Sequence, residues 1–179
     1  MKIKLQNIEN NLDTRLVSNS IINWYYLNGR LLPWRDTSRE KKNPYHIWIS
    51  EVMLQQTTVQ TVIPKFKSFI KRWPNIENLA KASIDDVLYE WQGLGYYSRA
   101  HNIHKTARLI SNDMNGKFPR NVLFLKTLPG IGDYTAGAIA SIAFSVPILP
   151  VDVNIKRVLA RLQGIILSEK KSNLKIRET

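Results

Sequence analysis

The chain has 179 residues, 44% of them hydrophobic, which is enough for one domain or for two small lobes with a buried core. Its 26 Lys and Arg residues outnumber 14 Asp and Glu residues, giving a formal net charge of +12. It has no cysteine, which excludes disulfides, thiolate catalysis and cysteine-bound zinc or iron–sulfur sites within this chain.

The positive charge is open to two interpretations. Basic proteins often bind polyanions, because each neutralised phosphate releases counterions. A generally basic composition from an A/T-rich genome, indicated by the Lys, Asn and Ile content, explains it equally well. No run of about 18 apolar residues is present, and residues 1–7 lack an apolar signal core. We therefore expect a cytoplasmic protein without a membrane span.

Apolar spacing predicts helices along almost the whole chain, so the expected class is all-α. The first covers residues 14–28, with a packed apolar face, and a charged loop follows at 36–43. Further helices are predicted to begin at Pro44 and Ser83 and to cover 61–73, 75–82, 98–115, 122–127, 134–144 and 154–162.

Two of these helices carry polar residues that need an interpretation. Glu51 lies in the apolar helix that begins at Pro44, where burial would raise the pKa of its carboxyl group. A solvated glutamate on the outer face is the more common arrangement, and the pattern alone favours it. In the helix 98–115, we expect Arg99 and His104 to belong to a solvated basic face rather than to a metal site.

Two glycine-containing segments are candidate ligand sites. Tyr96 and Tyr97 follow a glycine-flanked loop, and they are either core residues of the next helix or a wedge for a base pair. Pro129 ends one helix, and Gly130 and Gly132 allow positive φ before the next. The N–H groups at the start of that helix can hold a phosphate, although a tight αα-hairpin without a ligand has the same pattern.

Six motifs occur in one order between about residues 21 and 162. They are LPWR at 32–35, PY at 44–45, SEVMLQQT at 50–57, GLGYYSRA at 93–100, LPGIG at 128–132 and VDVNIKRVLAR at 151–161. Together they resemble the catalytic domain of bacterial adenine DNA glycosylases, the MutY family of the helix–hairpin–helix DNA glycosylases.

The resemblance implies a fold and a domain organisation. A six-helix barrel lobe would cover residues 30–140, with the helix–hairpin–helix at about 122–144. A second helical lobe, made of residues 1–29 and 141–179, would be incomplete, and a cleft would lie between the two lobes.

The implied function is base-excision repair of double-stranded DNA by a monomer. The enzyme would flip out an adenine mispaired with 8-oxoguanine or guanine and hydrolyse its N-glycosidic bond. Glu51 would be the general acid, and Asp152, otherwise an ordinary N-cap, would stabilise the sugar cation. Tyr134 occupies the position of the lysine nucleophile of bifunctional relatives, which implies base excision without strand cleavage. Asn154 would position water.

The resemblance also assigns DNA contacts. It places Arg30, Trp34 and Arg35 in an adenine pocket, and Gln56 with one of the two tyrosines at the lesion. Backbone amides around Gly130 and Gly132 would hold a phosphate, together with a monovalent cation. The full set of implied DNA-binding residues is Arg30, Trp34, Arg35, Gln55, Gln56, Thr57, Tyr96, Tyr97, Gly130, Ile131 and Gly132.

Three departures from the family leave other functions open. The chain ends at Thr179 without the family's four-cysteine [4Fe–4S] motif and 8-oxoguanine-reading domain, Val153 replaces a glycine, and the loop 36–43 is longer than usual. The alternatives are a related glycosylase for G:T mispairs or damaged bases, against which Gln55 and Gln56 weigh, and a non-catalytic DNA-binding fragment.

Overall fold

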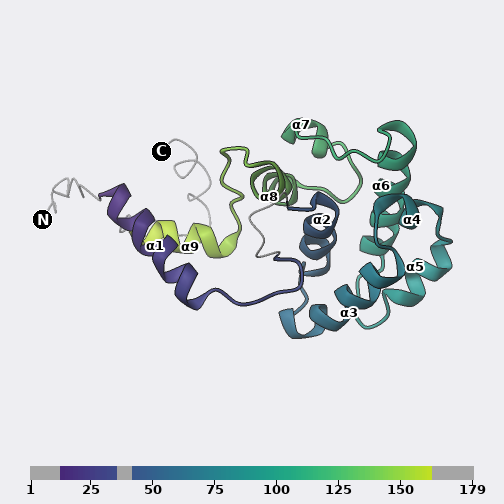
Figure 1. Cartoon of the computed structure of the whole chain (residues 1–179), viewed down its shortest axis with the longest axis horizontal. Helices are drawn as coiled ribbons and strands as arrows, with labels where there is room; N and C mark the ends of the chain where they lie inside the picture. The colour runs from purple at the N-terminus through teal and green to yellow at the C-terminus, as the bar shows by residue number, and fades with distance from the viewer. Residues whose placement is uncertain (1–12, 36–41, 163–179) are drawn as a thin grey trace, which may run out of the picture. The chain divides into compact units, whose positions relative to one another are not determined.

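The computed structural model describes residues 13–35 and 42–162 (Figure 1). These residues form helices and connecting loops, with no strand in the described ranges, so the predicted all-α class is confirmed. The helices are α1 (Thr14–Asn28), α2 (Pro44–Met53), α3 (Val59–Arg72), α4 (Ile76–Lys81), α5 (Ile84–Glu90), α6 (Ser98–Asp113), α7 (Val122–Leu125), α8 (Asp133–Phe144) and α9 (Val153–Leu162). Most of the loop 36–43 lies outside the described residues.

The chain divides into two compact units. One is continuous, Leu32–Asp152, and contains α2 to α8. The other consists of the flanking segments Met1–Leu31 and Val153–Thr179, with α1 and α9 as its described helices. The lobe boundaries given by the resemblance, 30–140 for the barrel, stay a prediction.

Helix α1 has the predicted bounds but not the predicted burial. The Asp13 side chain accepts hydrogen bonds from the N–H groups of Arg15 and Leu16, and so caps the first turn. None of its residues is buried; the Ile21 side chain, for example, is 54% exposed. The expectation of a packed apolar face is therefore wrong, because helical periodicity shows which side of a helix is apolar but not what covers it.

Side-chain caps set the starts of five helices in the unit Leu32–Asp152. The capping residues are Asn43, Thr58, Asn75, Ser83 and Asn121, and each accepts a hydrogen bond from a backbone N–H in the first turn of its helix. The cap at Thr58 explains why α3 begins two residues before the predicted start at 61.

The core of this unit forms where α4 packs along α6 and α2 packs along α8 (Figure 1). On α2, the side chains of Ile47, Trp48, Ile49, Val52 and Met53 are all at most 4% exposed. Burial on this scale stabilises the fold by about 25 cal/mol per Å² of apolar surface. Helix α2 is therefore a rigid support for the polar residues that lie on it and just after it.

Candidate active site

The carboxyl group of Glu51 lies on the buried helix α2, between Ser50 and Val52, which are 1% and 4% exposed. Burial raises the pKa of Glu51, and the negative charge of Asp152 raises it further. A hydrogen bond from Tyr134 and the charge of Arg35 act in the opposite direction and lower it. The net direction is upward, so the expectation of a solvated surface glutamate is wrong.

Tyr134 lies in the first turn of α8, the helix that packs along α2. Its hydroxyl group hydrogen-bonds the carboxylate of Glu51. Burial, and then the negative charges of Glu51 and Asp152, raise the pKa of this hydroxyl above its ordinary value. Tyr134 therefore remains a protonated donor to Glu51 throughout the physiological pH range.

Asp152 ends the extended segment that follows α8, and it interacts electrostatically with both Glu51 and Tyr134. This segment lies against α8, since a Cβ atom at position 137 would be in van der Waals contact with Pro150, 3.4 Å from its Cα. The structure thus brings together three of the four predicted catalytic residues, although 101 positions separate Glu51 from Asp152 in the sequence.

The predicted adenine-pocket residues have different surroundings. Arg35 interacts with Glu51, as its effect on the pKa of that carboxyl group shows. Trp34 is half-buried and packs edge-to-face on Phe66, with ring centroids 5.3 Å apart. Arg30 and Asn154 belong to the flanking unit, in which Asn154 Oδ1 accepts a hydrogen bond of 3.0 Å from Arg157 Nη2.

Three predicted DNA-contact residues directly follow α2. Gln55 is half-buried, and its Nε2 lies 3.5 Å from Thr135 Oγ1 on α8. Gln56 is exposed and has a φ of 55°, in the left-handed region. Thr57 Oγ1 donates to the carbonyl oxygen of Leu94, 3.4 Å away, in a second loop.

That second loop carries the two tyrosines in front of α6. Their side chains are 65% exposed for Tyr96 and 47% exposed for Tyr97, so the alternative that they are core residues is wrong. Tyr96 also has a φ of 46°, again in the left-handed region. Such backbone conformations are unfavourable for large residues and tend to occur at functional sites.

The hairpin between α7 and α8 is anchored by its apolar residue and by α6. Ile131 is 4% exposed, and its N–H donates to the carbonyl oxygen of Leu128. Thr106 on α6 donates to the carbonyl oxygen of Pro129, 3.0 Å away. Gly132 caps α8 without a side chain, so the N–H groups of the first turn face outward from a fixed support.

The two glycines of the hairpin have different requirements. Gly130 has a φ of +76°, and a Cβ atom there would be 2.8 Å from Asn102 Cβ. Gly132 has a φ of −86°, and a Cβ atom there would meet nothing within 4 Å. The prediction of positive φ is therefore right for Gly130 and wrong for Gly132, where the glycine leaves space outside the helix terminus.

The two alanine variants of the hairpin should separate folding from binding. Gly130→Ala should lower the stability of the fold by about 1–3 kcal/mol, because position 130 needs a left-handed backbone. Gly132→Ala should leave stability unchanged or raise it by up to about 1 kcal/mol, but reduce duplex affinity about 10- to 100-fold by blocking the predicted hydrogen bond to a DNA phosphate. Thermal unfolding and equilibrium titration with a duplex measure both; equal effects of the two variants would contradict this interpretation.

Two residues assigned to a solvated basic face of α6 are in fact engaged in the fold. Arg99 is 7% exposed, and its guanidinium group contacts backbone oxygens of both loops described above. His104 is half-buried, with Nε2 2.9 Å from the carbonyl oxygen of Ala82. Among the described residues, no group of three or more His, Cys, Asp or Glu could hold a metal ion.

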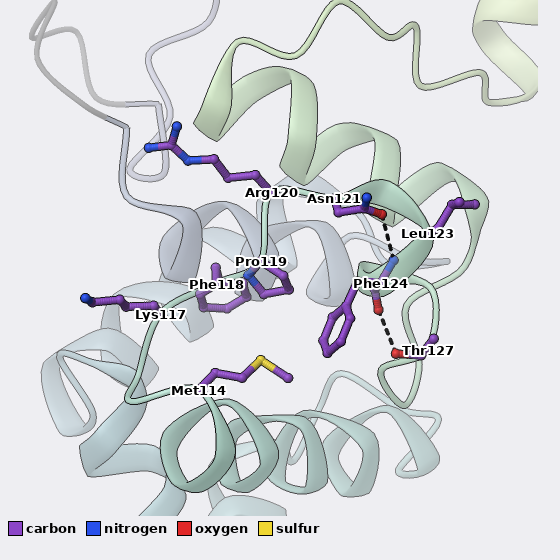
Figure 2. A pocket seen from close by; sticks show the side chains of 9 residues that line it. All are labelled: Met114, Lys117, Phe118, Pro119, Arg120, Asn121, Leu123, Phe124 and Thr127. Carbon is purple, nitrogen blue, oxygen red and sulfur yellow. Dashed lines mark hydrogen bonds between the residues drawn. The ribbon is translucent and has the colours of Figure 1, made fainter.

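An apolar groove of about 750 Å³ lies at the other end of the hairpin helices (Figure 2). It is lined by Met114, Lys117, Phe118, Pro119, Arg120, Asn121, Leu123, Phe124 and Thr127. None of the predicted catalytic or DNA-contact residues lines it, so this groove is separate from the carboxyl groups of Glu51 and Asp152. In the described ranges, no helix is long and apolar enough to cross a membrane.

Comparison with known proteins gives matches to one group. A family model described as "HhH-GPD superfamily base excision DNA repair protein" matches residues 49–178. The chain is 50% identical over 164 residues to the adenine DNA glycosylase of Buchnera aphidicola subsp. Schizaphis graminum, covering 89% of this chain and 46% of that protein. It is 44% identical over 151 residues to the adenine DNA glycosylase of Homo sapiens, covering 82% of this chain and 28% of that protein. The chain thus spans less than half the length of these relatives.

Solved structures agree on the fold. A thermostable thymine-DNA glycosylase matches with a TM-score of 0.73 and 29% identity, over 81% of this chain and 65% of that chain. A non-covalent endonuclease III–DNA complex matches with a TM-score of 0.66 and 24% identity, over 85% of this chain and 70% of that chain. The helix–hairpin–helix glycosylase fold predicted from the sequence motifs is confirmed.

Proposed function

Because the chain belongs to the HhH-GPD superfamily of base excision DNA repair proteins, we propose that it hydrolyses the N-glycosidic bond of adenine mispaired with 8-oxoguanine or guanine in double-stranded DNA. One observation supports this most strongly. Glu51 is half-buried, this burial raises the pKa of its carboxyl group, and the charge of a second carboxyl group, Asp152, raises it further. A carboxyl group with a raised pKa is suited to the role of general acid, and a second carboxyl group beside it to that of stabilising the sugar cation.

In the proposed reaction, protonated Glu51 donates its proton to N7 of the flipped adenine. The C1′–N9 bond then breaks with both electrons moving to the base, which leaves as neutral adenine, and an oxocarbenium-like sugar remains. The carboxylate of Asp152 stabilises this cation. Water adds to C1′, and the carboxylate of Glu51 takes up the proton that the water loses. Tyr134 donates to Glu51 throughout and holds its orientation.

The exposed loops and the hairpin would hold the DNA. Gln56 and Tyr96 project from exposed positions, where they are available to fill the space left by the flipped base. The helix terminus behind Gly132 would bind a backbone phosphate. Carbonyl oxygens of the hairpin would offer ligands to a monovalent cation, so we expect duplex affinity to differ between potassium and lithium salts.

Base release from a duplex that contains 8-oxoguanine opposite adenine tests the proposal. We expect adenine release under single-turnover conditions, with salt-sensitive binding of the duplex. Salt-sensitive binding without release, in both the unmodified chain and Glu51→Gln, would instead identify a non-catalytic DNA-binding protein.

A second candidate substrate class follows from the structural comparison. The solved structure with a TM-score of 0.73 is a thymine-DNA glycosylase, so thymine opposite guanine is a competing substrate. A panel of duplexes with G:T, G:U and alkylated bases, tested beside 8-oxoguanine:adenine, distinguishes the two. Faster release of thymine than of adenine would overturn the proposed substrate.

Tyrosine at position 134 underlies the proposal that the enzyme does not cleave the DNA strand, since a phenol cannot form a Schiff base with the sugar. We expect intact abasic strands after reaction, and no covalent complex after treatment with borohydride. Tyr134→Lys places an amine beside Glu51, and borohydride should then trap an imine between Lys and C1′. Absence of the trapped complex in a folded Tyr134→Lys variant would contradict the placement of Tyr134 at the sugar.

A further inference from the structure

Arg99 lies in the first turn of α6 and is 7% exposed. Its guanidinium group makes six hydrogen bonds. Nη1 lies within 3.0 Å of three carbonyl oxygens at the end of α2, those of Val52, Met53 and Gln55. The acceptors are backbone oxygens and one hydroxyl, and no carboxylate is among them.

The other half of the guanidinium group holds the second loop. Nη2 donates to the carbonyl oxygens of Leu94 and Gly95, at 2.7 and 3.2 Å, and to Thr57 Oγ1 at 3.2 Å. Thr57 Oγ1 in turn lies 3.4 Å from the carbonyl oxygen of Leu94. A single planar group therefore ties the loop after α2 to the loop before α6, as the fixed fork of arginine allows.

These two loops contain the two non-glycine residues of the site whose backbone is left-handed, Gln56 and Tyr96. Gln56 lies between two positions that bond to Arg99, namely Gln55 and Thr57, and Tyr96 directly follows a third, Gly95. The guanidinium carbon also lies 5.7 Å from the centroid of the Tyr96 ring. An unfavourable backbone conformation persists only where its surroundings enforce it, and here Arg99 supplies that constraint in both loops.

Arg99 also adjoins the hairpin. A cavity of about 30 Å³ is lined by Arg99, Gln55, Asn102 and Gly130, among others. Arg99 Nε and Trp48 Nε1 are buried without a hydrogen-bond partner, and both residues line this cavity, which has room for a water molecule. Arg99 is thus next to three of the predicted DNA-contact segments, the loop after α2, the loop before α6 and the hairpin.

We propose that Arg99 is a positioning residue that holds the loops 54–57 and 93–97 in the single conformation that presents Gln56 and Tyr96 to a mispair. This inference rests on the proposed function for the identity of the substrate. The hydrogen bonds by which Arg99 joins the two loops do not depend on that function. Lysine at position 99 would keep the charge and lose the planar fork, so it cannot serve both loops at once.

The test compares Arg99→Lys with the unmodified chain and with Arg72→Lys as a matched control. Arg72 is a partly exposed arginine on α3 that pairs with Asp86 and Glu90, outside both loops. We expect Arg99→Lys to weaken affinity for a duplex with an 8-oxoguanine:adenine pair 10- to 100-fold, and to leave affinity for the matched duplex within twofold. Arg72→Lys should change neither. Every protein in this binding comparison also carries Glu51→Gln, so that adenine is not released during the measurement.

Hydrogen exchange supplies a second readout that does not depend on substrate. Amides of residues 54–57 and 93–97 should exchange at least tenfold faster in Arg99→Lys, both loops together, while α4 and α5 keep their rates. A milder variant, Thr57→Val, removes one acceptor and should shift both loops in the same direction by about threefold.

The outcomes separate the two proposals. Faster exchange throughout the unit, or equal loss of affinity for matched and mispaired duplexes, would show a purely structural role and overturn the inference. Unchanged exchange in both loops would overturn it as well. If the unmodified chain releases no adenine and does not prefer the mispair, the proposed function fails, and the exchange rates of the two loops still decide the role of Arg99.

Discussion

Glu51→Gln should reduce the single-turnover rate of adenine release by about 10²- to 10⁴-fold, the contribution typical of a positioned general acid. The amide has nearly the same shape as the acid but carries no transferable proton. Binding of the duplex should stay within twofold, because Glu51 is half-buried and glutamine keeps its size and shape. Quenched-flow or manual sampling of product, together with a binding titration, measures both quantities.

The pH dependence of release gives a check on this assignment. Because the folded pKa of Glu51 is raised, the acid form persists to higher pH than for an ordinary glutamate, and the rate should fall as pH rises through that value. Glu77→Gln, on the exposed side of α4, is the matched control and should leave the rate unchanged. A rate for Glu51→Gln within threefold of the unmodified chain would remove Glu51 from the mechanism.

The same raised pKa affects stability. Ionised Glu51 is disfavoured in the fold, so the unmodified chain loses stability as pH rises from the ordinary glutamate pKa through the folded one. Glu51→Gln has no ionisable group at this position, so it does not lose stability in this way as pH rises. Its melting temperature should therefore exceed that of the unmodified chain by a few degrees, about 2–4 °C, at neutral pH and by less near pH 4. If Glu51→Gln is more stable than the unmodified chain and yet inactive, unfolding cannot explain its loss of activity.

Asp152→Asn should slow adenine release by about 10²- to 10³-fold, since it removes the carboxylate that we propose stabilises the sugar cation. The variant should also move the pH profile. Asp152 raises the pKa of Glu51, so its neutralisation lowers that pKa, and the fall in rate should occur at lower pH. Rates measured across the pH range, with 8-oxoguanine:adenine as substrate, give both effects from one experiment.

A shift of the rate profile to lower pH distinguishes the loss of the Asp152 charge from a general disruption of the site. Asp85→Asn makes the same chemical change at an exposed position on α5, and should leave both the rate and the pH profile unchanged. A slower Asp152→Asn enzyme with an unshifted profile would mean that Asp152 does not interact with Glu51 in the working enzyme.

Much of the fold was predictable because its signals are local. The cap at Ser83, the proline at the start of α2 and the hairpin sequence each involve a few neighbouring residues, and the helices lie close to their predicted bounds. The pairing of Glu51 with Asp152 was accessible only through the resemblance to a family, because nothing local to either residue indicates the other.

Other features depend on packing between distant segments and were missed. Arg99 has the sequence context of a solvated basic helix, and its burial follows from carbonyl groups that two separate loops direct at one point. Gly132 has the same sequence signal as Gly130, but only Gly130 has Asn102 beside it. Helix α1 differs from its prediction in the opposite direction, because its periodic apolar residues were expected to be packed and are exposed.

The proposed reacting groups Glu51, Tyr134 and Asp152 all belong to the continuous unit Leu32–Asp152, whereas α1 and α9 belong to the flanking segments. The relative placement of these three groups is thus fixed by packing inside one segment of chain. In evolutionary terms, this segment and its flanks can diverge at different rates. Exchange of flanking segments between related genes would then leave Glu51, Tyr134 and Asp152 together on one inherited piece of chain.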